Sequence, residues 1–371
     1  MPGFMNERAS RRSLFIDATR GLAMLFVCVS HFGIAYFGRL GKAHAEHLTS
    51  LIALPSTPTF IVLSGLLLGF LSVQSPASFP NLSIKLMDRG LFLLGPARAL
   101  VMIAHFVIFG SVRFFFITDT IGLCLLVGPW LVANFSSSLR ATLGVGLLAF
   151  SWFIYLTWLP AGGPSGVLHS ILVGDVPFRF GWLTFPILPW VGGYLLATPI
   201  GESLARWRKQ GEGFVLKLGA LAALCMVAGA AMHVVGRGQS PTVRELLSAG
   251  QKYPPSPAFL LACGGGGLGA TTLMAWLEQR RLFPAILSGF ATAGRSSLVV
   301  FVVQYFVYYV GIYSLHLPAT PLWPVFLAVS LAFIFGVAVW WDRRIGNEYL
   351  TVGLPYLLRA RGQSPAPTTQ L

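Results

Sequence analysis

The stretch LFIDATRGLAMLFVCVSHFGIAYF, residues 14–37, decides the fold. It is mostly apolar, and about 20 such residues suffice for a helix to cross the hydrocarbon core of a bilayer. It is too long for the apolar part of a signal peptide and carries Asp17 and Arg20, so we interpret it as a retained transmembrane helix. Similar runs recur along the chain, which predicts an all-α polytopic membrane protein.

Composition supports one membrane domain, predicted over residues 14–341, with a cytoplasmic segment at 1–13 and a cytoplasmic tail at 342–371. The chain is 55% hydrophobic and 10% charged, whereas soluble domains are about 25% charged. The tail from Gly362 is expected to be disordered. About ten spans are predicted: 14–37, 57–73, 90–110, 118–134, 141–159, 182–199, 215–235, 256–276, 294–315 and 321–341.

The basic residues indicate how these helices are oriented. The net charge is +14, and cytoplasmic loops of membrane proteins are rich in Lys and Arg. With ten spans, 17 of the 26 Lys and Arg residues fall on the side of the N-terminus, and 7 fall on the opposite side, where the longest loops are 38–56, 160–181 and 236–255. The bias predicts two cytoplasmic termini and basic loops that contact anionic lipids rather than nucleic acid.

The first predicted helix carries three ionisable residues at membrane depth, where such groups mark functional sites by default. Arg20 and His31 are 11 residues apart, so they face within about 20° of each other, about 16 Å apart along the axis. In a functional interpretation, Arg20 meets a phosphate-bearing donor from the cytoplasm, and His31 is the general base on an acceptor. In a structural interpretation, Arg20 pairs with Asp17 and His31 bonds a neighbouring helix.

The third predicted helix repeats this pattern, because Arg98 and His105 are seven residues apart. Arg98 and Arg89 are candidate donor-binding residues, and a structural polar contact is the alternative for Arg98. Lys85 and Asp88, beside Arg89, are predicted to form a solvated cytoplasmic interface.

Further candidates lie at the predicted outer ends of helices. Asp119 opens the fourth helix, where it either orients a histidine and binds acceptor hydroxyls or stabilises the helix N-terminus. Lys252 and Tyr253 precede the eighth helix and are candidate acceptor contacts. His44 and His47, in the first outer loop, are alternative bases.

Other polar and sulfur-containing residues receive structural interpretations. Gln304 and Tyr305 lie in the middle of the ninth predicted helix, and we expect interhelical hydrogen bonds from them. The four cysteines fall inside apolar runs without metal-ligand spacing, so we interpret them as packing residues and predict no metal site.

Several of these residues form a pattern that resembles a known family. Asp17-Ala-Thr-Arg20-Gly-Leu followed by His31 gives an arginine, ten residues and a histidine, as in the signature of the transmembrane acyltransferase superfamily. The chain most resembles bacterial relatives of heparan-alpha-glucosaminide N-acetyltransferase, with acyltransferase family 3 and the periplasmic-glucan succinyltransferases as near alternatives. Corroborating stretches are Leu63-Ser64-Gly65, Asp119 with Ile121-Gly122-Leu123, Phe185-Pro186-Ile-Leu-Pro189-Trp190, Lys252-Tyr253-Pro254-Pro255-Ser256 and Gly294-Arg295-Ser-Ser-Leu298.

The resemblance implies transfer of an acyl group, commonly acetyl, from cytoplasmic acyl-CoA to a glycan or lipid-linked saccharide across a bacterial cell membrane. By the motif, His31 matches the family's catalytic histidine and Arg20 its arginine. In the lysosomal enzyme the catalytic histidine is placed in the loop after the first core helix, which favours His44 or His47 here, whereas the facing geometry favours His31. Direct transfer and an acyl-histidine intermediate are both open.

Two other classes of function compete with the transferase. A secondary transporter or flippase for an envelope component would use Arg20 and His31 as a substrate or proton pathway. A non-catalytic membrane scaffold for envelope-glycan assembly is the third class. The sequence leaves open the acyl group, the acceptor, O- versus N-transfer, and whether the protein is a homodimer.

Overall fold

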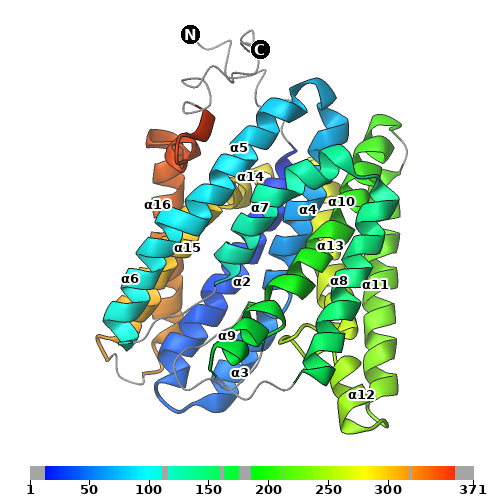
Figure 1. The fold of residues 1–371 in the computed structure, drawn as a ribbon. Coiled ribbons are helices and arrows are strands. Elements are labelled where there is room, and N and C mark those ends of the chain that lie inside the picture. Colours follow the sequence, from blue (N-terminus) through cyan, green and yellow to red (C-terminus); the bar gives the residue numbers. More distant parts are fainter. Residues whose placement is uncertain are drawn as a thin grey trace. The chain divides into compact units, whose positions relative to one another are not determined.

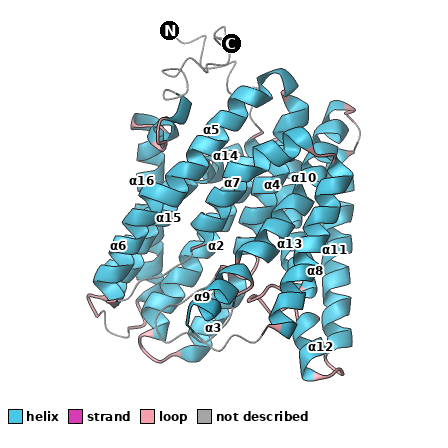
Figure 2. Ribbon diagram, viewed as in Figure 1, coloured by secondary structure: helices cyan, strands magenta, loops and turns pink. Residues whose placement is uncertain are grey.

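The computed structural model describes residues 13–110, 116–158, 163–174, 185–211, 213–316 and 320–355 of the 371-residue chain. Within these ranges every named element is a helix (Figure 2), which confirms the predicted all-α fold. The expected N-terminal segment up to residue 12 and the tail beyond residue 355 lie outside the described residues. The chain forms two compact units, the first from residues 1–59, 215–222 and 266–347 and the second from residues 60–214, 223–265 and 348–371.

The first unit is built around its N-terminal helix (Figure 1). This helix, α2 (Leu14–Gly33), packs against α3, α14, α15 and α16. The unit also contains the start of α4, part of α11 and the larger part of α13, from residue 266 onward. Its own elements are α2, η1 (Ile34–Gly38), α3 (Ala43–Ile52), α14 (Pro284–Arg295), α15 (Ser297–Tyr305), η4 (Phe306–Tyr313) and α16 (Trp323–Arg344).

Two glycines allow α2 and α14 to approach more closely than any other residue would permit. A Cβ on Gly21 would lie 1.9 Å from the carbonyl oxygen of Phe290, and one on Gly294 would lie 1.8 Å from the carbonyl oxygen of Asp17. Small residues at helix contacts allow such close packing in membranes, where there is little hydrophobic gain from helix association. This contact fixes α2, which carries Arg20 and His31, against α14.

The helix pair α14 and α15 forms a broken span. Its two halves meet at an angle of 74°. Arg295, the last residue of α14, donates to Asp342 of α16 with an Nη2–Oδ2 distance of 2.6 Å. The ninth predicted span starts at residue 294 and leaves most of α14 outside any predicted helix, which is wrong. The segment is helical but has only 12 residues, fewer than the about 20 that a span requires.

The second unit contains the remaining helices. Here α10 packs on α8 and on α7, and α5 packs on α7. In Figure 1, α5 and α6 continue one another along one rod. The elements are α4 (Ser56–Gln74), η2 (Pro76–Ser78), α5 (Phe79–Phe92), η3 (Leu93–Ala97), α6 (Arg98–Phe109), α7 (Ile117–Asn134), α8 (Ser137–Thr157), α9 (Gly163–Leu172), α10 (Ile187–Lys209), α11 (Phe214–Gly236), α12 (Pro241–Leu246), α13 (Pro257–Arg280) and η5 (Asn347–Tyr349).

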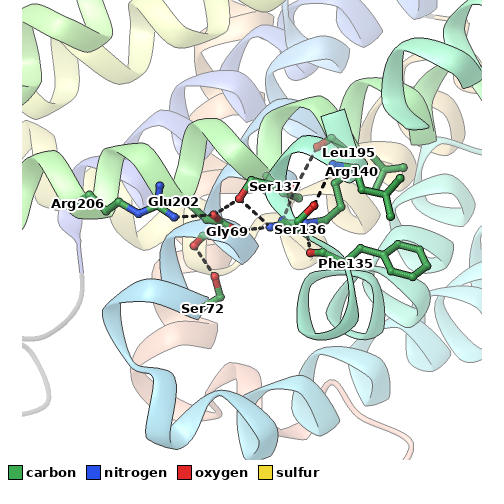
Figure 3. A network of polar contacts seen from close by, with 11 residues as sticks. Gly69, Ser72, Phe135, Ser136, Ser137, Arg140, Leu195, Glu202 and Arg206 are labelled. Carbon is green, nitrogen blue, oxygen red and sulfur yellow. Dashed lines mark hydrogen bonds and ion pairs between the residues drawn. The ribbon is translucent and has the colours of Figure 1, made fainter. Parts of the chain in front are cut away.

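A buried ionic network joins α8 to α10 (Figure 3). The guanidinium of Arg140, only 2% exposed, donates to the carbonyl of Phe135 at 3.1 Å, to the hydroxyl of Thr198 at 2.7 Å and to the carboxylate of Glu202. Arg206 donates to the other Glu202 oxygen at 3.0 Å. The predicted span 141–159 starts one residue after Arg140 and so leaves this arginine in a loop, which is wrong, because α8 begins three residues before Arg140 and buries its side chain.

The observed helices agree with most of the predicted spans. Among the described residues, eight helical segments are long and apolar enough to cross a membrane, and nine if the broken span counts as one. The sixth predicted span, at 182–199, corresponds to α10, which is 23 residues long but less apolar because it contains prolines, glycines and Glu202. The chain is therefore a polytopic membrane protein, with eight or nine clear spans among its described residues and α10 as a more polar helix of similar length.

Three segments that sequence analysis described as outer loops contain short helices. They are α3 within 38–56, α9 within 160–181 and α12 within 236–255. Accordingly, His44 and His47 lie on the helix α3 and not in an irregular loop. These helices have 6 to 10 residues, which is too short for the periodicity that separates a helix from a loop in sequence.

Candidate active site

His31 lies in the last turn of α2 and is held by a side chain from α15. Its Nδ1 atom is 2.8 Å from Oε1 of Gln304, and Nε2 of Gln304 donates to the carbonyl oxygen of Phe301 at 3.0 Å. Gln304 is fully buried, whereas His31 is half-buried. The expected interhelical bond from Gln304 is confirmed, and its partner is the candidate base itself.

Two tyrosines flank this pair in the first unit. The rings of His31 and Tyr309 lie 5.7 Å apart between centroids and are tilted by 59°. Tyr309 in turn packs against Tyr305 at 4.9 Å. The imidazole is therefore held on one edge by an amide and on one face by an aromatic ring, which restricts its rotation.

Arg20 forms the ion pair with Asp17 that the structural interpretation predicted. Nη1 of Arg20 is 3.9 Å from Oδ1 of Asp17, a long contact between residues one turn apart. The Arg20 side chain is 19% exposed, while Asp17 is buried. The ion pair and a ligand-binding role are compatible, because the guanidinium has five N–H donors and keeps part of its surface accessible.

π-Helical turns accompany the candidate residues in three separate places. η1 begins three residues after His31, η4 begins two residues after Gln304 and contains Tyr309, and η3 ends immediately before Arg98. π-Helical turns are rare and occur frequently at functional sites, because the extra residue redirects side chains and frees backbone groups. The recurrence of this feature beside His31, Gln304 and Arg98 favours a functional role for these helices.

In the second unit, the structure brings Arg98 and Asp119 together. Nε of Arg98 is 4.0 Å from Oδ2 of Asp119, and the same oxygen accepts the backbone N–H of Phe116 at 2.9 Å. Asp119 is 0% exposed, and its Oδ1 has no hydrogen-bond partner in the described part of the chain. The carboxylate thus stabilises the N-terminus of α7, as one interpretation predicted, and still has one oxygen available as an acceptor.

His105 packs beside this ion pair. Its ring lies 4.7 Å from Phe109 and 6.2 Å from Phe116, and it is buried. Since Phe116 also donates to Asp119, Arg98 and His105 both make their contacts at the start of α7. The predicted shared orientation of these two residues agrees with this arrangement.

The structure differs in one respect from the solvated cytoplasmic interface predicted around Arg89. Arg89 is half-buried and Lys85 exposed, but Asp88 is buried. The Asp88 carboxylate accepts the backbone N–H groups of Val352 at 3.1 Å and Leu354 at 3.0 Å, in addition to the hydroxyl of Thr351. The prediction of a solvated Asp88 was wrong, because the C-terminal segment of the second unit covers it.

The remaining candidates occupy two further places. In the second unit, the Lys252 ammonium lies 5.7 Å from the centre of the Phe185 ring and 5.3 Å from that of Tyr253. In the first unit, His44 and His47 are exposed on α3. Cation–π contacts orient the lysine head group, so the segment before α13 presents an ordered cation next to two aromatic rings.

The candidates therefore form separate groups within each unit. Arg20, His31 and Gln304 belong to the first unit, and the ion pair of Arg98 and Asp119 belongs to the second. No described group of three His, Cys, Asp or Glu side chains has the arrangement of a metal site. The chemistry that these residues can perform is proton transfer by His31 and binding of anionic groups by the arginines.

Comparison with known proteins gives one match. The model of the family described as heparan-alpha-glucosaminide N-acetyltransferase, catalytic, matches residues 12–232. The matched region includes His31, Arg20 and Asp119 and ends before Lys252 and Gln304. No curated protein matches the chain.

Proposed function

This chain belongs to the family of the heparan-alpha-glucosaminide N-acetyltransferase catalytic domain, and we propose that it moves an acetyl group from cytoplasmic acyl-CoA to a saccharide on the other side of the membrane. The observation that carries the proposal is the imidazole of His31, held at Nδ1 by Gln304. This imidazole shares a helix face with Arg20. The family supports a membrane acetyltransferase, and these residues suggest how such an enzyme works.

Arg20 is the residue proposed to bind the donor. Acyl-CoA carries phosphate groups, and guanidinium groups bind phosphate oxygens through paired, charge-assisted hydrogen bonds. Arg20 lies in the half of α2 nearer the N-terminus, which the charge bias assigns to the cytoplasmic side. Arg89 and Arg98 are proposed as further donor contacts, with Arg98 shared between the donor and Asp119.

His31 is proposed to act as the general base. Its Nε2 accepts the proton of the acceptor hydroxyl or amine while the acceptor oxygen or nitrogen forms a bond to the acyl carbon. The carbon–sulfur bond of the thioester then breaks, and the CoA thiolate takes up the proton from the imidazolium. No net charge or proton is gained. In the alternative with an acyl-histidine intermediate, Nε2 attacks the thioester carbonyl, the carbon–sulfur bond breaks and the CoA thiolate leaves. The acceptor then bonds to the acyl carbon as the bond to Nε2 breaks, and its proton passes through the released imidazole to the thiolate.

The acceptor is proposed to be a glycan or lipid-linked saccharide of the bacterial cell envelope. Asp119 would accept a hydrogen bond from an acceptor hydroxyl through its buried Oδ1. Lys252 and Tyr253 would contact the saccharide at the outer end of α13, and His44 and His47 would do so from α3. Aromatic rings next to polar groups suit a sugar, whose faces are apolar and whose edges carry hydroxyls.

The test is an acetyl-transfer assay with the purified full-length protein in lipid nanodiscs, labelled acetyl-CoA and a saccharide with a terminal glucosamine. We expect His31→Ala to lower kcat by about 10²- to 10⁴-fold, the usual contribution of a general base. Arg20→Gln is expected to raise KM for acetyl-CoA. His316→Asn is the matched control, because His316 is exposed in the first unit and its Nδ1 lies 2.7 Å from the nearby carbonyl of Ser314.

The same assay separates the rival interpretations. Full activity of His31→Ala together with loss of activity in His47→Ala or His44→Ala would move the base to α3. If the native protein transfers no acetyl group but takes saccharide into vesicles without acetyl-CoA, it is a transporter and not a transferase. The broken span of α14 and α15 is a feature that such transporters also use, so this comparison is necessary.

A further inference from the structure

The side chain of Gln304 has one orientation that satisfies its neighbours. Its Nε2 donates to the carbonyl of Phe301, which places Oε1 toward His31 at 2.8 Å from Nδ1. An amide oxygen only accepts hydrogen bonds, so the imidazole nitrogen facing it must carry a hydrogen. The network therefore assigns the proton of neutral His31 to Nδ1.

The consequence for His31 concerns its other nitrogen. A neutral imidazole has one N–H, so with Nδ1 protonated the lone pair resides on Nε2. A general base needs this lone pair on the nitrogen that meets the acceptor. The opposite tautomer would put two lone pairs face to face between Nδ1 and Oε1 at 2.8 Å, where they repel each other.

We propose that Gln304 is a positioning residue that holds His31 in the Nδ1–H tautomer, with Tyr309 restricting the ring plane. This proposal rests on the proposed function, in which Nε2 of His31 is the base. Gln304 lies beyond residues 12–232, so the family match does not assign it a role. It is delivered by α15, the second half of the broken span, immediately before the π-helical η4 that carries Tyr309.

The neutral amide of Gln304 affects the His31 imidazole differently from a carboxylate. A carboxylate at this position would stabilise the imidazolium form and so make the base harder to regenerate near neutral pH. An amide fixes the tautomer and the ring orientation without adding a negative charge to the buried site, which keeps desolvation costs low. Gln304 therefore supplies orientation alone.

The kinetic test uses three variants. Gln304→Leu removes the acceptor with little change in size, and we expect kcat to fall at least about 10-fold while KM for acetyl-CoA stays near the native value, because a wrong tautomer slows the chemical step. Gln304→Glu keeps an acceptor and should recover part of kcat, with the acidic limb of the pH–rate profile moved to higher pH. Gln74→Leu, the same substitution on α4, is the control and should leave both parameters unchanged.

A second measurement is independent of activity. In protein labelled with ¹⁵N-histidine, the nitrogen signals of His31, assigned by their loss in His31→Asn, should show a protonated Nδ1 in the native protein and a mixture of tautomers in Gln304→Leu. A protonated Nε2 in the native protein would overturn the proposal, and so would a native kcat and pH profile in both Gln304 variants. If His31→Ala keeps full activity while the Nδ1 assignment holds, the proposed function fails and the positioning contact stands.

Discussion

At the scale of single residues, the ion pair of Arg140 and Glu202 depends on both partners. Each side chain is buried and each group is neutralised by the other, with Arg206 and Thr198 completing the contacts. A buried ion pair adds little over apolar packing, but an isolated buried charge is expensive. The network thus joins α8 to α10, and removal of either charged side chain should destabilise the protein.

Glu202→Ala should therefore destabilise the protein by about 3–5 kcal/mol, since it leaves Arg140 charged and buried. The measurement is the thermal unfolding midpoint of the purified protein in detergent. Glu245→Ala is the control, because Glu245 is exposed on α12. Replacing both Arg140 and Glu202 with methionine should recover part of the loss, and equal midpoints for the two alanine variants would contradict this account.

His169, on α9 outside the membrane spans, predicts an effect of pH on stability. The residue is 2% exposed and packs against Trp158 with ring centroids 5.4 Å apart. Burial lowers the pKa of His169 because the charged imidazolium loses hydration. Its folded-state pKa lies below the unfolded value of about 6.5, so its contribution to stability is complete above that pH and disappears as the pH falls through the folded-state pKa.

The unfolding midpoint of the native protein should therefore fall between pH 7.5 and pH 5, and it should fall less in His169→Gln. Comparison of the two proteins at both pH values isolates this histidine from the other six. If the unfolding midpoint falls equally in both proteins, a group other than His169 causes the pH effect.

Sequence alone could predict some of these residue-level features. The shared face of Arg20 and His31 follows from helical periodicity, and the pairing of Arg20 with Asp17 follows from their spacing. The bond between His31 and Gln304 joins residues 273 positions apart, and no local pattern encodes such a pairing. The burial of Arg140 was missed because an arginine next to an apolar run looks like a membrane-flanking charge.

At the scale of elements, the contact between α2 and α14 is set by backbone approach. Gly294 meets the carbonyl of Asp17 and Gly21 meets that of Phe290. A methyl group at either position has no space, and a backbone cannot move aside as a long side chain can. The position of α2, and with it the candidate site of the first unit, depends on these two residues having no side chain.

Gly294→Ala should accordingly lower the stability of the protein by about 1–3 kcal/mol, the usual cost of overpacking, and reduce acetyl transfer. Gly289→Ala, on the same helix, is the matched control because Gly289 is exposed and a Cβ there would meet nothing within 4 Å. Unfolding midpoints and transfer rates of both variants give the test. If Gly294→Ala has the same unfolding midpoint and transfer rate as the native protein, α2 and α14 are able to separate without loss of stability or activity.

The elements themselves were largely predictable, because long apolar runs have few alternatives in a membrane. Two kinds of element were not. The helix α14 is too short to be recognised as a span, and the ion pair next to its bend to α15 joins Arg295 to Asp342, 47 positions further along the chain. The helices α3, α9 and α12 lie in segments rich in turn-forming residues, where tertiary packing decides the local structure.

At the scale of the whole molecule, the bias of basic residues predicts the orientation in the membrane. A fluorescent protein fused to the C-terminus should fold and fluoresce, as it does in the cytoplasm. The same reporter inserted at Gly238, in the turn between α11 and α12, should stay dark, whereas alkaline phosphatase inserted there should be active. An active phosphatase at the C-terminus would reverse the predicted orientation and with it the proposed side of donor binding.

The contact between Asp88 and residues 351–354 also determines when this carboxylate gains its partners during synthesis. Asp88 leaves the ribosome more than 260 residues before the backbone amides that its carboxylate accepts. Until residues 351–354 have been synthesised, this carboxylate has to bind water, lipid head groups or a chaperone in their place. Residues 351–354 are thus needed to cover Asp88, and a ribosome that stalls just before Thr351 would release a chain with the described helices of membrane-spanning length but with Asp88 of α5 uncovered.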